Sequence, residues 1–116
     1  MTATTVEVWQ PVCHLGDLLP ERGVCALVDD VQVAVFRTFD GELHAVGNID
    51  PFSGAGVLSR GIVGTRAGVP TVSSPLFKQT FDLTTGKCFD DPQVAVPVYG
   101  VRLRDGLVEV SVRCRA

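Results

Sequence analysis

Alternating apolar and polar residues, separated by turn signals, predict that most of this chain folds into short β-strands. The clearest case is residues 99–112, which have Asp105-Gly106 at their centre. A two-residue loop there places apolar residues opposite one another: Leu103 with Val108, Val101 with Val110 and Tyr99 with Val112. These six share one face, and the other face carries Arg102, Arg104, Leu107 and Glu109. Turn and alternation agree, which predicts a hairpin with one buried face.

A second hairpin is predicted around Asp40-Gly41. Residues 31–39 are rich in β-branched and aromatic side chains, and residues 42–46 return as the partner strand. Both faces are partly apolar, so we expect this hairpin to be central and covered on two sides. Only one helical turn is predicted, at 13–19 before Pro20. Further short strands are predicted at 6–9, 24–28, 81–83, 87–89 and, as an edge or bulge containing Pro97, 94–98.

The middle of the chain, residues 48–82, is dense in glycine and proline. Such a segment predicts a long excursion with little regular structure, made of turns and close backbone approaches. It is nevertheless too apolar for disorder, since it carries Ile49, Phe52, Val57, Leu58, Ile62, Val63, Leu76, Phe77 and Phe81. We therefore expect an all-β sandwich or barrel, one domain over residues 1–116, with a small two-loop lobe at about 48–82.

The composition of the chain limits the kinds of partner that we expect it to bind. The 116 residues are 46% hydrophobic and 20% charged, with a net charge of −3. No basic stripe favours nucleic acid, no apolar run of membrane-spanning length occurs, and no secretory signal pattern is present, so a cytoplasmic protein is expected. Four arginines lie near the C-terminus, and they are interpreted as a solvated strand face and tail, with a partner-docking patch as the alternative: Arg102, Arg104, Arg113 and Arg115.

No catalytic, cofactor-binding or metal-ligating constellation is evident. Asp29-Asp30 and Asp90-Asp91 adjoin turn signals and are interpreted as turn formers, and His44 as a packed or rim histidine. The Gly-rich stretch 54–56 lacks the helix pattern that should follow a phosphate-binding loop. No Cys-x-x-Cys pair occurs, so the cysteines are interpreted as buried small residues or surface thiols: Cys13, Cys25, Cys88 and Cys114.

The order of the motifs resembles Rieske-type iron–sulfur domains. Phe-Asp-Leu-Thr-Thr-Gly at 81–86 is followed by an Asp-Gly hairpin, and it is preceded by Gly54-Ala55, Leu-Ser-Arg-Gly at 58–61 and Ser74-Pro75. In that family one loop carries Cys-x-His and the other Cys-x-x-His. Two thiolates hold one iron and two imidazoles hold the other. The resemblance implies an antiparallel β fold in which two loops form the lobe.

Aligned on these motifs, the four ligand positions fall on Asp50, Phe52, Ser74 and Phe77. None is a thiol or an imidazole, so a cluster of this type is not expected on this chain. Two aromatic rings at former ligand positions suggest another way to hold the loops together. We expect Phe52 and Phe77 to form lobe core; alternatively, one of them stays exposed as an interface anchor.

Three longer strings carry a narrower resemblance. Residues 47–55, 58–64 and 74–79 are similar to the small subunits of bacterial assimilatory NAD(P)H nitrite reductases. That resemblance implies an accessory subunit without a cofactor, beside a large catalytic subunit that carries FAD, an iron–sulfur cluster and sirohaem and reduces nitrite to ammonium. A Rieske-type ferredoxin and a general interaction module are the alternatives. We expect docking through lobe residues Asp50, Phe52, Phe77, Lys78 and Gln79.

Overall fold

The computed structural model describes residues 6–76, 78–112 and 114–115, and it confirms the predicted all-β class. Two 3₁₀ turns, η1 (Leu15–Asp17) and η2 (Leu58–Arg60), accompany the strands. In chain order the strands are β1 (Val6–Glu7), β2 (Gln10–His14), β3 (Arg22–Val28), β4 (Val31–Arg37), β5 (Leu43–Gly47), β6 (Ile62–Arg66), β7 (Val69–Ser73), β8 (Thr80–Asp82), β9 (Val98–Arg104), β10 (Leu107–Ser111) and β11 (Cys114–Arg115). None of the helical turns in these residues is long or apolar enough to cross a membrane.

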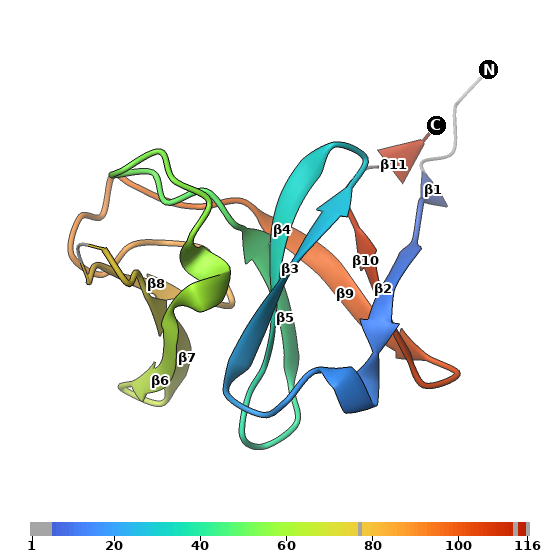
Figure 1. Ribbon diagram of the computed structural model, residues 1–116. Coiled ribbons are helices and arrows are strands. Elements are labelled where there is room, and N and C mark those ends of the chain that lie inside the picture. The colour runs from blue at the N-terminus through green and yellow to red at the C-terminus, as the bar shows by residue number, and fades with distance from the viewer. Residues whose placement is uncertain (1–5, 77, 113, 116) are drawn as a thin grey trace.

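Six strands form an antiparallel sheet in the order β2-β10-β9-β5-β4-β3. The sheet curls until its two edge strands, β2 and β3, touch, which gives it a barrel-like form. All six strands contribute aliphatic side chains to one enclosed cluster, and Leu18 closes it after η1. At the far end β1 pairs with β11, so the described ends of the chain lie side by side, away from the lobe (Figure 1).

Strand β4 is covered on both faces, as its pattern predicts. Its residues 33–36 are all fully buried. Val33 and Val35 enter the barrel interior, whereas Ala34 and Phe36 enter a second cluster on the lobe side. Because neighbouring side chains of a strand point to opposite faces, four consecutive buried residues require two cores. The hairpin loop is longer than predicted: Thr38 and Glu42 still pair, which leaves three residues, 39–41, in the loop.

The lobe contains regular structure that the sequence analysis missed. Strands β6, β7 and β8 form a three-stranded antiparallel sheet within residues 62–82. Ala67 and Gly68 both have positive φ, of 53° and 81°, and make the two-residue turn between β6 and β7. The prediction of little regular structure across 48–82 is therefore wrong for its second half, and it holds only for the loops that flank this sheet.

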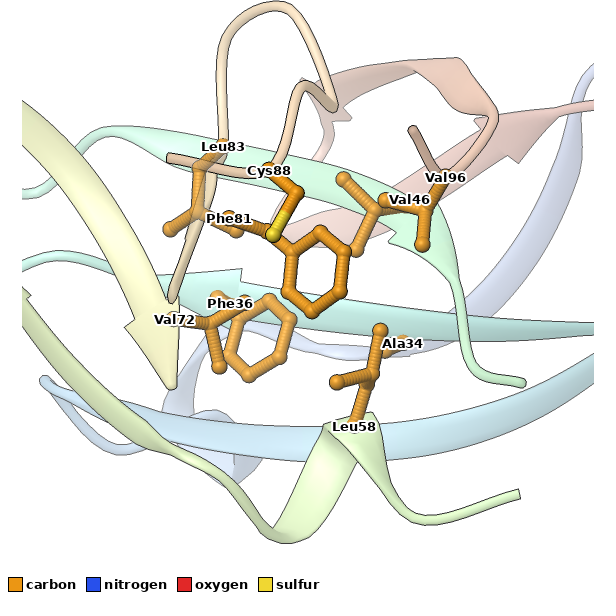
Figure 2. Packing of buried hydrophobic residues seen from close by; sticks show 9 residues of the cluster. All are labelled: Ala34, Phe36, Val46, Leu58, Val72, Phe81, Leu83, Cys88 and Val96. Atoms are coloured by element: carbon orange, nitrogen blue, oxygen red, sulfur yellow. The ribbon is translucent and has the colours of Figure 1, made fainter. Parts of the chain in front are cut away.

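A second apolar cluster joins the lobe to the barrel. The rings of Phe36 from β4 and Phe81 from β8 lie beside each other, with Leu58 of η2 next to them (Figure 2). Chain that follows the lobe also contributes, through Leu83, Cys88 and Val96. The lobe is therefore packed on the barrel through shared core. That residues 1–116 form one domain stays a prediction.

The C-terminal hairpin has the predicted register. Val108 lies opposite Leu103 and Val110 opposite Val101, and the strand β10 ends before the third predicted pair. The expectation of a uniformly buried face is wrong at Leu103, which is 49% exposed because it lies next to the turn, beyond the barrel interior.

Other predicted elements are shorter than expected. The helical turn is confined to η1, and Cys13 and His14 belong to β2. The predicted strand 6–9 stops at Glu7. Segments 87–89 and 94–98 contain only single bridges, Phe81 with Cys88 and Lys87 with Ala95, and Val98 instead begins β9. These segments were too short to build ladders of their own.

Candidate functional site

Asp50 and Ser74, one from each lobe loop, are joined by a buried hydrogen bond. The Ser74 hydroxyl donates to Asp50 Oδ2 at 2.6 Å, and both side chains are fully enclosed. The other carboxylate oxygen, Oδ1, accepts from the Phe52 backbone N–H at 2.8 Å. A hydrogen bond to a carboxylate is stronger than one between neutral groups. This contact therefore links two loops that are 24 residues apart in the chain.

The first loop is shaped by Asp50 and Gly54. Asp50 donates its N–H to the Ala55 carbonyl, and its own carbonyl accepts from Gly54. Gly54 has φ of 75°, the left-handed region that favours glycine. The Asp-Pro-Phe-Ser-Gly string thus folds into a tight turn that directs the Asp50 carboxylate inward and leaves Phe52 at the tip.

The second loop closes on Ser74 in a similar way. The Ser74 N–H donates to the Gln79 carbonyl at 2.9 Å, and the Lys78 N–H donates to the Ser74 carbonyl at 3.0 Å. The Leu76 N–H reaches the Ser74 hydroxyl oxygen at 3.3 Å. Ser74 therefore both shapes its own loop and bonds the opposite one.

Asn48 is a positioning residue that the sequence analysis did not single out. Its side-chain amide donates to Gln32 Oε1 at 3.1 Å and to Cys25 Sγ at 3.4 Å, and its Oδ1 accepts from the Ser59 N–H at 2.8 Å. It is 1% exposed. Because a buried amide must satisfy its hydrogen bonds, Asn48 fixes the start of the lobe against β3, β4 and η2. An asparagine just after the predicted strand 42–46 is the only signal in the sequence, and it is a weak one.

The residues predicted to form the partner interface differ in how exposed they are. Phe52 is 37% exposed and rests its inner side on Phe81, with ring centroids 6.3 Å apart. Lys78 is exposed, and Gln79 is partly buried. Phe77 lies outside the described residues, so its contact with Phe52 stays a prediction. The expectation that Asp50 offers its side chain to a partner is wrong, because the carboxylate is completely buried.

Elsewhere in the described residues, the histidine and cysteine side chains do not gather into a catalytic or metal-binding group. His44 is mostly buried and contacts Glu42 at 3.3 Å, as expected of a rim histidine. Burial raises the pKa of the Cys13 thiol, and the negative charge of Asp17 adds to this effect. A raised pKa lowers the thiolate fraction and makes a weak nucleophile. Cys13, Cys25 and Cys88 are all free thiols.

Known proteins of one family are similar to this chain. The model of the Rieske-like [2Fe-2S] domain family matches residues 8–111. The NADH nitrite reductase small subunit of Escherichia coli K12 is 46% identical over 103 residues, which cover 88% of this chain and 95% of that protein. The chain belongs to the Rieske-like nitrite reductase small subunits.

Two further relatives extend this assignment. A crystal structure from Mycobacterium tuberculosis, assigned as an NADH-dependent nitrite reductase small subunit, is 52% identical with a TM-score of 0.88, over 96% of this chain and 97% of that one. The NAD(P)H nitrite reductase large subunit of Klebsiella oxytoca is 38% identical over 103 residues, covering 89% of this chain but 11% of that protein. In the Klebsiella protein, a unit similar to this Rieske-like chain is therefore part of the large polypeptide.

The residues of this Rieske-like lobe do not fit the cluster that gives the family its name. Rieske irons take two thiolates and two imidazoles. The described positions here are a carboxylate, a phenyl ring and a hydroxyl, at Asp50, Phe52 and Ser74. The two positions that would share one iron are instead bonded to each other. Within the described part of the chain, no three His, Cys, Asp or Glu side chains gather as a metal site.

Proposed function

We propose that this chain is the accessory small subunit of an NAD(P)H-dependent nitrite reductase, without catalytic residues of its own. The similarity to small subunits over nearly their whole length supports this role. Its partner is then the large catalytic subunit, which holds FAD, an iron–sulfur cluster and sirohaem, and neither nucleic acid nor a membrane is a partner. The three described free thiols suit the reducing cytoplasm, where we place the complex.

The Klebsiella protein supports a direct contact between the two subunits. There, a unit similar to this chain makes up 11% of a large subunit. Two units that belong to one polypeptide meet at a high effective concentration. Where the same units are separate chains, a binding surface must replace the covalent link, and we propose that this chain carries such a surface.

The second part of the proposal rests on the hydrogen bond between Asp50 and Ser74. We propose that it takes over the structural role of a cluster, which is to join the two lobe loops, and that this chain binds no iron. The substitution keeps the lobe closed while removing the redox centre. Electrons then pass only through cofactors of the large subunit.

We propose that the lobe tip is the docking surface. Phe52 is held from below by Phe81 and exposes the rest of its ring, and Ile49 and Leu76 are also exposed within the lobe. Lys78 and Gln79 add polar groups, and Phe77 is included from the sequence. Aromatic residues that are pre-positioned and partly exposed are frequent binding anchors. Asp50 acts beneath this surface by holding Phe52 in place.

Reconstitution tests the proposal. Purified large subunit is assayed for NAD(P)H-dependent nitrite reduction with and without this chain, and complex formation is followed by gel filtration. We expect a stable complex, a change in turnover or in the lifetime of activity, and an iron content near zero in the isolated small chain. No complex and no kinetic effect would refute the subunit role. Stoichiometric iron with a Rieske-type spectrum would instead favour the ferredoxin alternative.

A further inference from the structure

Two Arg-Gly pairs meet where the barrel joins the lobe. Arg22-Gly23 begins β3, and Arg60-Gly61 ends η2. A Cβ added to Gly23 would lie 2.5 Å from the Ser59 carbonyl oxygen, and one added to Gly61 would lie 2.4 Å from the Ser73 carbonyl oxygen. Only glycine allows backbones to approach this closely. The close approach of Gly23 to Ser59 therefore brings Arg22 and Arg60, far apart in the sequence, to one region of the molecule.

The arginines border a groove of about 330 Å³. It is lined by Arg22, Gly23, Ser59, Arg60 and Gly61. No acidic side chain lines it. The nearby carboxylates of Glu21, Asp40 and Glu42 border a different and smaller cavity, of about 150 Å³, between the β4–β5 loop and the β6–β7 hairpin. The groove is therefore lined by two arginines and by no acidic residue.

Of the described arginines, three have partners, whereas Arg22 and Arg60, like Arg104, have none. Arg37 donates to the Leu18 carbonyl, Arg66 stacks on Phe89, and Arg102 pairs with Glu109 at 2.7 Å. By contrast, Arg22 and Arg60 are exposed and form no such contact, and neither does the Ser59 hydroxyl. Three strong donors therefore remain available at one groove.

A third positive charge lies close by. Arg37 is the register partner of Arg22 across β3 and β4. Like charges directly opposite in a sheet are unfavourable. Arg37 donates to the Leu18 carbonyl on the barrel side, so the positive charges that line the groove are those of Arg22 and Arg60.

We propose that this groove binds a planar anion with two oxygen atoms, either a carboxylate or nitrite. The planar guanidinium fork donates two parallel hydrogen bonds and matches such an anion. Arg22 and Arg60 supply the forks, and the Ser59 hydroxyl supplies a further donor. The site does not depend on the assignment of the lobe as docking surface. Two sources share this chemistry: an acidic side chain of the large subunit, and free nitrite.

Amide chemical shifts of the isolated, isotope-labelled chain test the site. The chain is titrated with sodium nitrite, acetate and phosphate at constant ionic strength, with chloride as the balancing ion. We expect saturable shifts at the Gly23, Ser59 and Gly61 amides for nitrite and acetate. Affinity should fall about tenfold in Arg22→Gln and Arg60→Gln. It should also fall in Arg60→Lys, which keeps the charge but loses the fork.

The matched control is Arg104→Gln, which removes another exposed arginine that has no partner among the described residues and lies away from the groove. It should leave the titration unchanged. Shifts that stay linear with concentration, or that fall equally in Arg60→Gln and Arg104→Gln, would overturn the site. Phosphate binding more tightly than both planar anions would overturn the proposed class of ligand.

The same variants separate the two sources. If nitrite binds at least tenfold more tightly than acetate, the ligand is the free ion. If the two anions bind alike and Arg60→Gln weakens the complex with the large subunit, the ligand is a carboxylate of that subunit. Either result supports the anion site. Because the titration uses the isolated chain, its failure leaves the subunit role untouched, and a missing complex leaves the titration valid.

Discussion

The barrel interior and the junction between barrel and lobe are stabilised in different ways. The barrel cluster draws aliphatic side chains from six strands and contains no phenylalanine among its buried members. The junction depends on two phenylalanine rings, Phe36 and Phe81, which come from different regions. Among the described residues, four of the six buried polar or charged ones also lie within 48–74, namely Asn48, Asp50, Thr71 and Ser74.

This difference separates what holds the scaffold together from what occupies the candidate cluster site. The barrel interior is filled by side chains from its own six strands together with Leu18. The lobe instead relies on a few specific contacts at its loops, and one of these, Asp50 with Ser74, lies at the positions of metal ligands. The scaffold and the site are therefore separable, and function resides in the site.

Removing a shared ring should produce the largest effect. Phe36→Ala deletes a fully buried ring that contacts both regions, so we expect a loss of roughly 3–5 kcal/mol in the free energy of unfolding. Urea denaturation followed by circular dichroism measures it. Leu103→Ala, at an exposed position, is the control and should change stability by less than about 0.5 kcal/mol. A loss below about 1 kcal/mol for Phe36→Ala would mean that the junction is not structural core.

Breaking the Asp50–Ser74 hydrogen bond should have the second-largest effect on stability. This loss should be confined to the lobe. Asp50→Ala leaves two donors, the Ser74 hydroxyl and the Phe52 N–H, without their acceptor, which should cost about 3 kcal/mol. Ser74→Ala removes one donor and should cost about 1.5 kcal/mol. A double-mutant cycle from urea melts gives the coupling between the two.

Hydrogen exchange locates this loss. Protection should fall at the Phe52 and Leu76 amides, while the amides of β9 and β10 keep theirs. Additive single-mutant effects would show that the two residues do not act as a pair. Equal loss of protection in the barrel would contradict the separation of the two regions.

Close backbone approach at the junction gives a third test. Gly61→Ala places a Cβ 2.4 Å from the Ser73 carbonyl oxygen and 3.0 Å from that of Leu58, and backbone atoms cannot move away easily. We expect a loss of about 2 kcal/mol. Gly64→Ala is the matched control in the same lobe, because its Cβ meets only Thr71 Oγ1 at an ordinary 3.7 Å. Equal melting temperatures for the two variants would show that the junction adjusts.

The sequence predicted the barrel better than the lobe, for physical reasons. At 99–112 the turn signal and the alternation specify the same register, and the structure has that register. Strand β7 contains Pro70, which normally argues against a strand. It is tolerated because β8 pairs only with residues 71–73, so the missing N–H of Pro70 breaks no ladder there. The Ala67-Gly68 turn is also a weaker signal than Asp-Gly.

The candidate site was located by its resemblance, but its contacts were not predicted. Alignment placed Asp50 and Ser74 at positions that would share one iron, which already implied that they lie close together. That a carboxylate and a hydroxyl bond there depends on the packing of two distant loops, and no local pattern reports it. Asn48 was missed for the same reason, since its partners lie on three other elements.

The smallest expected effect concerns a polar contact on the barrel side, in the β4–β5 loop. A hydrogen bond from the Thr38 hydroxyl lowers the pKa of Asp40 below its ordinary value of 3.8. A lowered folded-state pKa contributes stability that is present above pH 3.8 and is lost as the pH falls through the folded value. Asp40→Asn should therefore be slightly less stable than the parent at pH 7, and the difference should vanish at strongly acidic pH.

Carbon-detected titration of the Asp40 carboxyl group measures the shift directly. Thr38→Ser keeps the hydroxyl and should preserve the low pKa of Asp40, whereas Thr38→Val should return it toward 3.8. If Thr38→Val left the pKa unchanged, His44 and the loop backbone would be the main cause instead. Because Asp40 is exposed, its contribution is screened by solvent, whereas the buried Asp50 acts without such screening. Burial, not the type of side chain, therefore decides which aspartate holds the structure together.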